Sequence, residues 1–153
     1  MSPRKLQTII AAAFLLSCLT LAAQENGDWR PAGNTARSIT GDVALSKGKI
    51  FINFSAFPLA RIRTLDQAET SAAFDTDNTD TGTGTLYRLS IPATKKFLHK
   101  NSLCGDEEAQ WMVAYVSGRT LQLAFFSGEK PPIFTFDAIS NSTDLCGTFS
   151  YTK

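Results

Sequence analysis

Cysteine chemistry gives the sharpest prediction in this sequence, because the chain has three cysteines and a single histidine. Cys104 and Cys146 stand in similar surroundings, SLCG at 102–105 and DLCG at 144–147. A zinc or redox site is the alternative, but no Cys-x-x-Cys occurs and His99 is the one imidazole available as a ligand. In an exported chain, such a pair is typical of a disulfide. We therefore predict a bridge between Cys104 and Cys146, and no metal or cofactor.

A run of acidic residues at 74–85, FDTDNTDTGTGT, could supply oxygen ligands for calcium. An EF-hand loop that began at Asp75 would need glycine at its sixth position and glutamate at its twelfth. The chain has Asp80 and Leu86 at those positions. The sequence thus favours a solvated loop between strands over a cation site.

Paired carboxylates could perform glycoside hydrolysis if two of them faced each other across a cleft. The consecutive Asp106, Glu107 and Glu108 do not fit this requirement, because adjacent side chains point apart. A set that only the fold brings together, such as Asp42, Asp106 and Asp137, remains the alternative. The spacing indicates no particular pair, so we assign no catalytic residue.

Nucleophilic catalysis and phosphate binding lack their usual motifs in this chain. No serine stands in Gly-x-Ser-x-Gly, and His99 is the only imidazole base. His99 lies in TKKFLHK, where basic residues could bind a polyanion but a solvated surface turn is the preferred interpretation. Trp29 and Trp111 could mark a ligand surface. Trp111 alternates with apolar residues, however, and is predicted to be buried.

The N-terminus has the layout of a secretory signal peptide over residues 1–23. Arg4 and Lys5 precede an almost wholly apolar run, and polar residues follow that run at once. Small residues at the end of the run favour cleavage between Ala23 and Gln24. The mature chain is therefore predicted to begin at Gln24.

Cys18 offers a competing interpretation as the lipidated first residue of a mature lipoprotein. Ser17 before it loosely fits a lipobox, but LTLAA continues the apolar run beyond it. A membrane anchor is the other alternative, and a run of about 18 residues is at the lower limit for a span. We expect an exported protein, periplasmic or extracellular, without a lipid anchor at Cys18 and without a stable membrane span.

Residues 24–153 are enough for one domain with its own core. Removal of the signal peptide leaves 13 basic and 14 acidic residues. A net charge near −1 gives no long-range attraction for nucleic acid or anionic lipid. We expect a partner that is another protein or a component of the cell envelope, and no nucleic acid.

Period-two patterns dominate the mature chain and predict an all-β fold. IFINF alternates Ile50, Ile52 and Phe54 on one face, and 109–128 indicates a central hairpin with its turn at 117–120. Seven or eight such segments indicate a single small antiparallel β-sandwich or β-barrel.

The boundaries of this domain follow from composition. The polar segment 24–37 is predicted to be an extended leader, and 38–153 the single β domain. Short helices are expected only at 65–74 and 92–101, whereas PIFTFDAI at 132–139 is predicted to be a strand.

Two functions agree with these features. The first is a secreted or periplasmic binding module without enzymatic activity, of the inhibitor or immunity type. Its contacts are expected from loops 66–84, 93–108 and 128–144, because β domains present loops on a rigid frame. The alternative is a small secreted hydrolase that uses the carboxylates named above.

Overall fold

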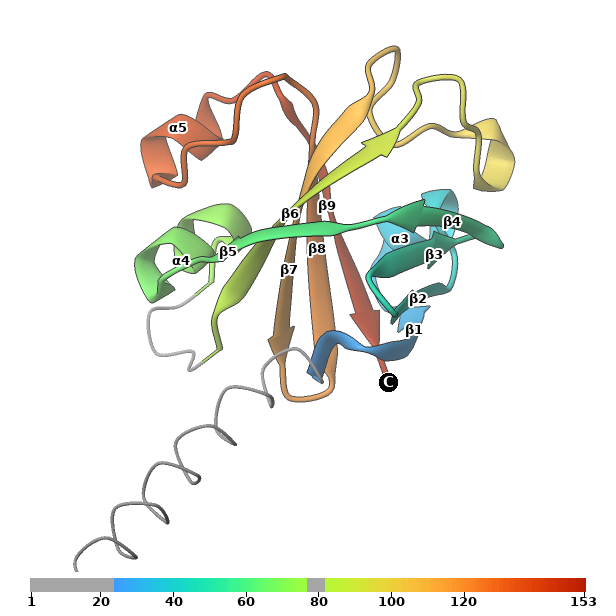
Figure 1. Ribbon diagram of the computed structural model, residues 1–153, viewed down its shortest axis with the longest axis horizontal. Coiled ribbons are helices and arrows are strands. Elements are labelled where there is room, and N and C mark those ends of the chain that lie inside the picture. Colours follow the sequence, from blue (N-terminus) through green and yellow to red (C-terminus); the bar gives the residue numbers. More distant parts are fainter. Residues whose placement is uncertain (1–23, 77–81) are drawn as a thin grey trace, which may run out of the picture.

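Nine antiparallel strands form one sheet in the computed structural model, which describes residues 24–76 and 82–153 (Figure 1). Their spatial order is β4-β3-β2-β1-β9-β8-β7-β6-β5. This confirms the all-β antiparallel prediction, with slightly more strands than the seven or eight expected. The strands are β1 (Gly27–Pro31), β2 (Val43–Ser46), β3 (Lys49–Ile52), β4 (Ser55–Pro58), β5 (Ala60–Thr64), β6 (Gly84–Ile91), β7 (Ala109–Ser117), β8 (Thr120–Phe126) and β9 (Leu145–Thr152).

The sheet curves into a nearly closed barrel because its two end strands are consecutive in the chain. Leu59 joins β4 to β5, and its backbone N–H donates to the carbonyl of Gly48 over 2.8 Å. In Figure 1 the joined strands cross the front of the barrel as one continuous segment. One bent segment therefore forms both ends of the sheet.

The central hairpin β7–β8 is buried on both faces, as its apolar sequence predicts. On the inner face, Met112 and Phe125 belong to the larger core cluster. On the outer face, Trp111 and Phe126 belong to a second cluster, to which helices α4 (Gln67–Phe74) and α5 (Phe136–Ser140) contribute. Trp111 is 7% exposed, which confirms its predicted burial.

The predicted leader at 24–37 is wrong, because this segment is part of the barrel. Its residues form β1, which pairs with both β2 and β9, and most of helix α3 (Asn34–Ile39). Trp29 on β1 is 1% exposed, and its Nε1–H donates to the carbonyl of Glu25 over 2.9 Å. Ala36 on α3 is also fully buried. Single buried residues in a polar segment are enough to hold it against the core.

The helices agree with the sequence in part. Helix α4 matches the expectation at 65–74, and a 3-10 turn, η1 (Leu98–Lys100), lies within 92–101. The predicted strand at 132–139 is wrong, since α5 begins there instead. Thr135 caps α5 by accepting from the backbone N–H of Ala138 over 3.2 Å, and Asp137 in the first turn suits the helix dipole.

The disulfide between Cys104 and Cys146 is present, with an S–S distance of 1.98 Å and a Cα–Cα distance of 4.8 Å. Cys146 lies on β9, whereas Cys104 lies in the loop between η1 and β7. The bridge therefore fastens that loop to the C-terminal strand, and the prediction is confirmed.

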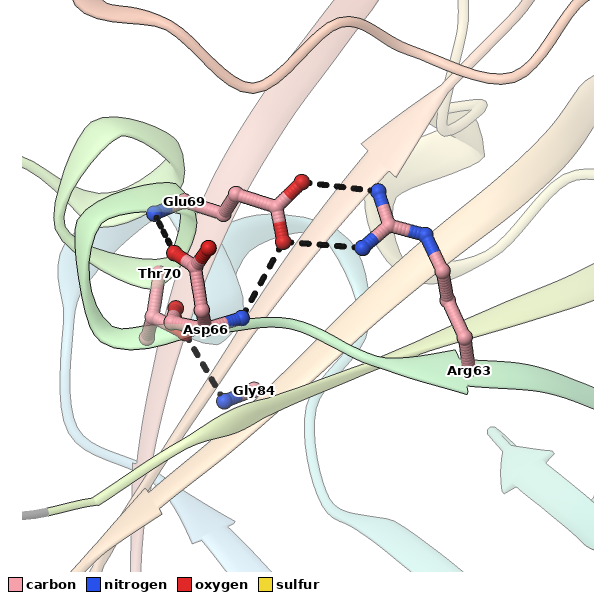
Figure 2. A network of polar contacts seen from close by, with 5 residues as sticks. All are labelled: Arg63, Asp66, Glu69, Thr70 and Gly84. Atoms are coloured by element: carbon pink, nitrogen blue, oxygen red, sulfur yellow. Dashed lines mark hydrogen bonds and ion pairs between the residues drawn. The ribbon is translucent and has the colours of Figure 1, made fainter.

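Helix α4 is anchored to the barrel by the polar network in Figure 2. Asp66 and Glu69 form a capping box, in which each side chain accepts from the other residue's backbone N–H at 2.8 and 3.0 Å. Arg63 on β5 donates two hydrogen bonds of 2.8 Å to Glu69, and this guanidinium lowers the pKa of that carboxyl. The Thr70 hydroxyl accepts from the N–H of Gly84 over 2.9 Å, which ties α4 to β6.

Some predictions fall outside the described residues. The signal peptide, Cys18 and residues 77–81 of the acidic loop belong to this group. Within residues 24–76 and 82–153, no helix is both long enough and apolar enough to cross a membrane.

Candidate functional site

The three carboxylates of the hydrolase alternative lie on separate elements. Asp42 precedes β2, Asp106 follows Cys104 in its loop, and Asp137 is on α5. All three are exposed, and α5 and β2 lie on opposite sides of the barrel in Figure 1. The structure therefore does not gather them in one cleft. Over the described part of the chain, no three His, Cys, Asp or Glu residues form a group that could hold a metal ion.

His99 in η1 is hydrogen-bonded to helix α3. Its Nδ1–H donates to the carbonyl of Ser38 over 3.0 Å, and the Asn101 amide donates to the same oxygen over 3.2 Å. Lys95 Nζ lies 5.9 Å from the centre of the Phe97 ring. These contacts give His99 a structural role and place the basic segment at the surface, in agreement with the preferred interpretation.

The most unusual surface residue is Phe54, at the turn between β3 and β4. Ile52 pairs with Ser55, so the turn consists of Asn53 and Phe54, which have φ angles of +46° and +65°. Positive φ at both residues is typical of a type I′ turn, whose second position strongly favours glycine. Phe54 is 101% exposed, so no packing offsets the cost of about 1–2 kcal/mol for a left-handed residue with a side chain. Strain of this kind at a surface aromatic suggests a functional site.

Phe54 borders a large open groove, which we name the hairpin groove. Its volume is about 1180 Å³. Phe51, which is 37% exposed, lies on β3 beside the turn and adds a second aromatic side chain to the lining. The lining residues are Asp28, Trp29, Arg30, Thr40, Gly41, Asp42, Val43, Ala44, Phe51, Asn53, Phe54, Leu98, Arg119, Thr152 and Lys153.

Charged residues surround the apolar part of the hairpin groove. Lys153 Nζ lies 4.4 Å from the centre of a ring of Trp29 and donates to the carbonyl of Asn26 over 3.0 Å. Arg119 donates to the backbone carbonyl of Lys153 over 2.7 Å, which orients the Arg119 side chain at the groove. With Arg30, the lining holds three cationic side chains and two carboxylates. The groove can therefore accept apolar and anionic groups together.

Sequence reasoning missed this site. It placed Phe54 on the buried face with Ile50 and Ile52; both isoleucines are fully buried, but the strand ends at Ile52 and Phe54 points into solvent. Asn53 was the available signal, since asparagine tolerates positive φ in two-residue turns. Among the described residues of the three predicted contact loops, only Leu98 in 93–108 lines the hairpin groove.

No protein-family model, curated protein or solved structure matches this chain. The groove is consequently interpreted from its own residues: a paired β3–β4 hairpin, an exposed aromatic side chain at its tip and a charged rim.

Proposed function

We propose that this chain is an exported, non-enzymatic binding module that recognises another protein of the cell envelope or the extracellular space. The hairpin groove is the contact surface, and an inhibitor or an immunity-type protein is the class that it fits. The observation that carries this proposal is Phe54, an aromatic side chain held fully in solvent by a strained turn.

The chemistry of the groove favours a protein partner. Aromatic side chains are enriched among the residues that dominate binding energy at protein interfaces, and a hairpin that is already folded loses less entropy on docking than a disordered segment would. The partner would offer an apolar side chain to Phe51 and Phe54, and carboxylates to Arg30, Arg119 and Lys153. Because the charges lie at the rim, they would set orientation and association rate more than affinity.

Replacement of Phe54 by glycine separates binding from folding. Relief of left-handed strain is worth about 1–2 kcal/mol, whereas glycine costs roughly 0.5–1 kcal/mol in unfolded-state entropy. Phe54→Gly is therefore expected to leave the free energy of unfolding unchanged or to raise it by up to about 1.5 kcal/mol. Loss of a central contact of about 2 kcal/mol would weaken partner binding about 30-fold. Urea denaturation and calorimetry measure the two effects.

Phe136 provides a matched control, because it is an aromatic residue that is 52% exposed on α5, within the predicted loop 128–144. Wild-type protein, Phe54→Gly and Phe136→Ser would each be used to capture partners from envelope and secreted fractions. A partner held by the wild type and by Phe136→Ser, but lost with Phe54→Gly, supports the proposal. Capture that survives Phe54→Gly, or that fails only with Phe136→Ser, contradicts it and moves the interface to α5.

The N-terminus of the bait tests the proposed location in the same preparation. Signal-peptide removal after Ala23 gives a mass that begins at Gln24. Mass spectrometry of the exported protein should therefore show this start and no acyl group. A diacylated N-terminal Cys18 would instead mean that the same domain is tethered to a membrane.

A further inference from the structure

A second cavity lies at the mouth of the barrel and shares no lining residue with the hairpin groove. Its volume is about 310 Å³, which equals about ten liquid water molecules at roughly 30 Å³ each. Mouths of β-barrels commonly bind small molecules. We name this cavity the mouth pocket; its lining includes Glu25, Arg61, Thr64, Thr83, Thr85 and Tyr87.

Glu25 is the buried charged group of this pocket. Glu25 is 6% exposed, and its backbone carbonyl accepts a hydrogen bond from the indole N–H of Trp29. The carboxylate accepts from the Tyr87 hydroxyl over 2.5 Å and from the side chain of Thr85. Both donors are neutral hydroxyls, so the carboxylate is oriented without being neutralised.

Among residues 24–76 and 82–153, the one ion pair joins Arg63 to Glu69. No cationic side chain of these residues therefore contacts the Glu25 carboxylate. Arg61 acts on Glu25 only at longer range, and its guanidinium donates to Thr64 over 2.5 Å. Burial consequently raises the pKa of Glu25 above its ordinary value of 4.5, although both hydrogen bonds and Arg61 oppose the shift. A buried carboxylate without a counterion costs stability, and such groups are concentrated at functional sites.

We propose that the mouth pocket binds a free amino acid, whose ammonium group becomes the counterion of Glu25 and whose carboxylate contacts Arg61. The hydroxyls of Thr64 and Thr83 line the same pocket and suit the remaining polar atoms of such a ligand. The small volume excludes a folded partner or a long peptide. This site is independent of the hairpin groove.

Isothermal titration calorimetry with the exported protein tests the proposal. The probes are the common L-amino acids, each paired with its N-acetyl derivative, which has the carboxylate but no ammonium group. At least one amino acid should bind, and its N-acetyl form should bind at least tenfold more weakly. No binding of any amino acid, or equal binding of the acetylated form, overturns the proposal.

Matched variants locate the site. Glu25→Gln keeps the acceptor for Tyr87 but removes the charge, and should weaken binding at least tenfold; Arg61→Gln should also weaken it. Arg63→Gln changes a neighbouring arginine that does not line the pocket, so its affinity should equal that of the wild type. Amino acid binding that persists in both Glu25→Gln and Arg61→Gln overturns the assignment to this pocket.

Glu25→Gln has a second readout that requires no ligand. The titratable and charged groups that face Glu25 are Tyr87 on β6 and Arg61 on β5. Since the folded-state pKa of Glu25 lies above its unfolded value, the native wild type gains stability as pH falls from the folded pKa towards 4.5. The variant should lack this gain and should melt at a higher temperature than the wild type at pH 7. Identical pH profiles of thermal denaturation would contradict a buried charged Glu25.

Discussion

Loss of the Cys104–Cys146 disulfide is expected to lower the free energy of unfolding by about 4 kcal/mol, because the bridge closes a long loop in the unfolded chain. The two cysteines are 42 positions apart. A domain of this size is typically stable by about 5–15 kcal/mol, so the bridge accounts for a large share of that stability. Both cysteines are only partly buried, so their replacement by alanine removes little packing.

The measurement is urea denaturation of the double variant Cys104→Ala/Cys146→Ala beside the wild type, with and without reductant. The denaturation midpoint should fall in the variant, and reductant should lower the wild-type midpoint by a similar amount. Reductant should leave the variant unchanged, which makes it the control for effects other than the bridge. A wild-type midpoint that is insensitive to full reduction would show that the loop entropy contributes little.

Replacement of Trp29 by alanine is expected to lower the free energy of unfolding by about 3–5 kcal/mol, which is usual for removal of a large aromatic side chain from a core. Trp29 is 1% exposed and packs in the larger core cluster, and its indole also holds the carbonyl of Glu25. If residues 24–37 were a solvated leader, the same replacement would change the free energy of unfolding by no more than about 0.5 kcal/mol. The size of the effect therefore decides between a leader and a barrel strand.

Trp29→Phe provides a graded variant if the alanine variant is too unstable to purify. It retains most of the apolar volume but loses the indole hydrogen bond, so its cost should lie well below that of alanine. Chemical denaturation of both variants checks the order. Arg30→Ala on the same strand is a surface control, since Arg30 is exposed. An equal loss in Arg30→Ala would indicate a general weakness of β1 and not the burial of Trp29.

Strands with long alternating or doubly apolar patterns were predictable from the sequence. The β7–β8 hairpin is the clearest case, since Ser117 pairs with Thr120 around a two-residue turn. Short elements were not predictable, because one buried residue in a polar segment carries no periodic signal. β1 depends on the buried Trp29, and α3 depends on the buried Ala36. Their burial is set by the elements that pack against them and not by local propensity.

Neither candidate site has a local signal of comparable strength. Glu25 owes its burial to a barrel mouth that forms only on folding, and its hydrogen-bond donor Tyr87 is 62 positions away. Phe54 continues an alternating pattern that β3 abandons at Ile52, so the pattern assigns it to the core. In both cases a turn or a distant neighbour, and not the residue type, determines what the side chain contacts.

The pairing of β1 with β9 determines the order in which this domain can fold. Arg30 pairs with Thr152, so the first strand of the barrel lacks one neighbour until the final strand has been synthesised. A nascent chain can form the local β2–β3 and β7–β8 hairpins early, but not the closed barrel. Topologies that depend on such distant contacts fold slowly. Closure of the barrel is therefore a late step in folding, because it requires both β1 and β9.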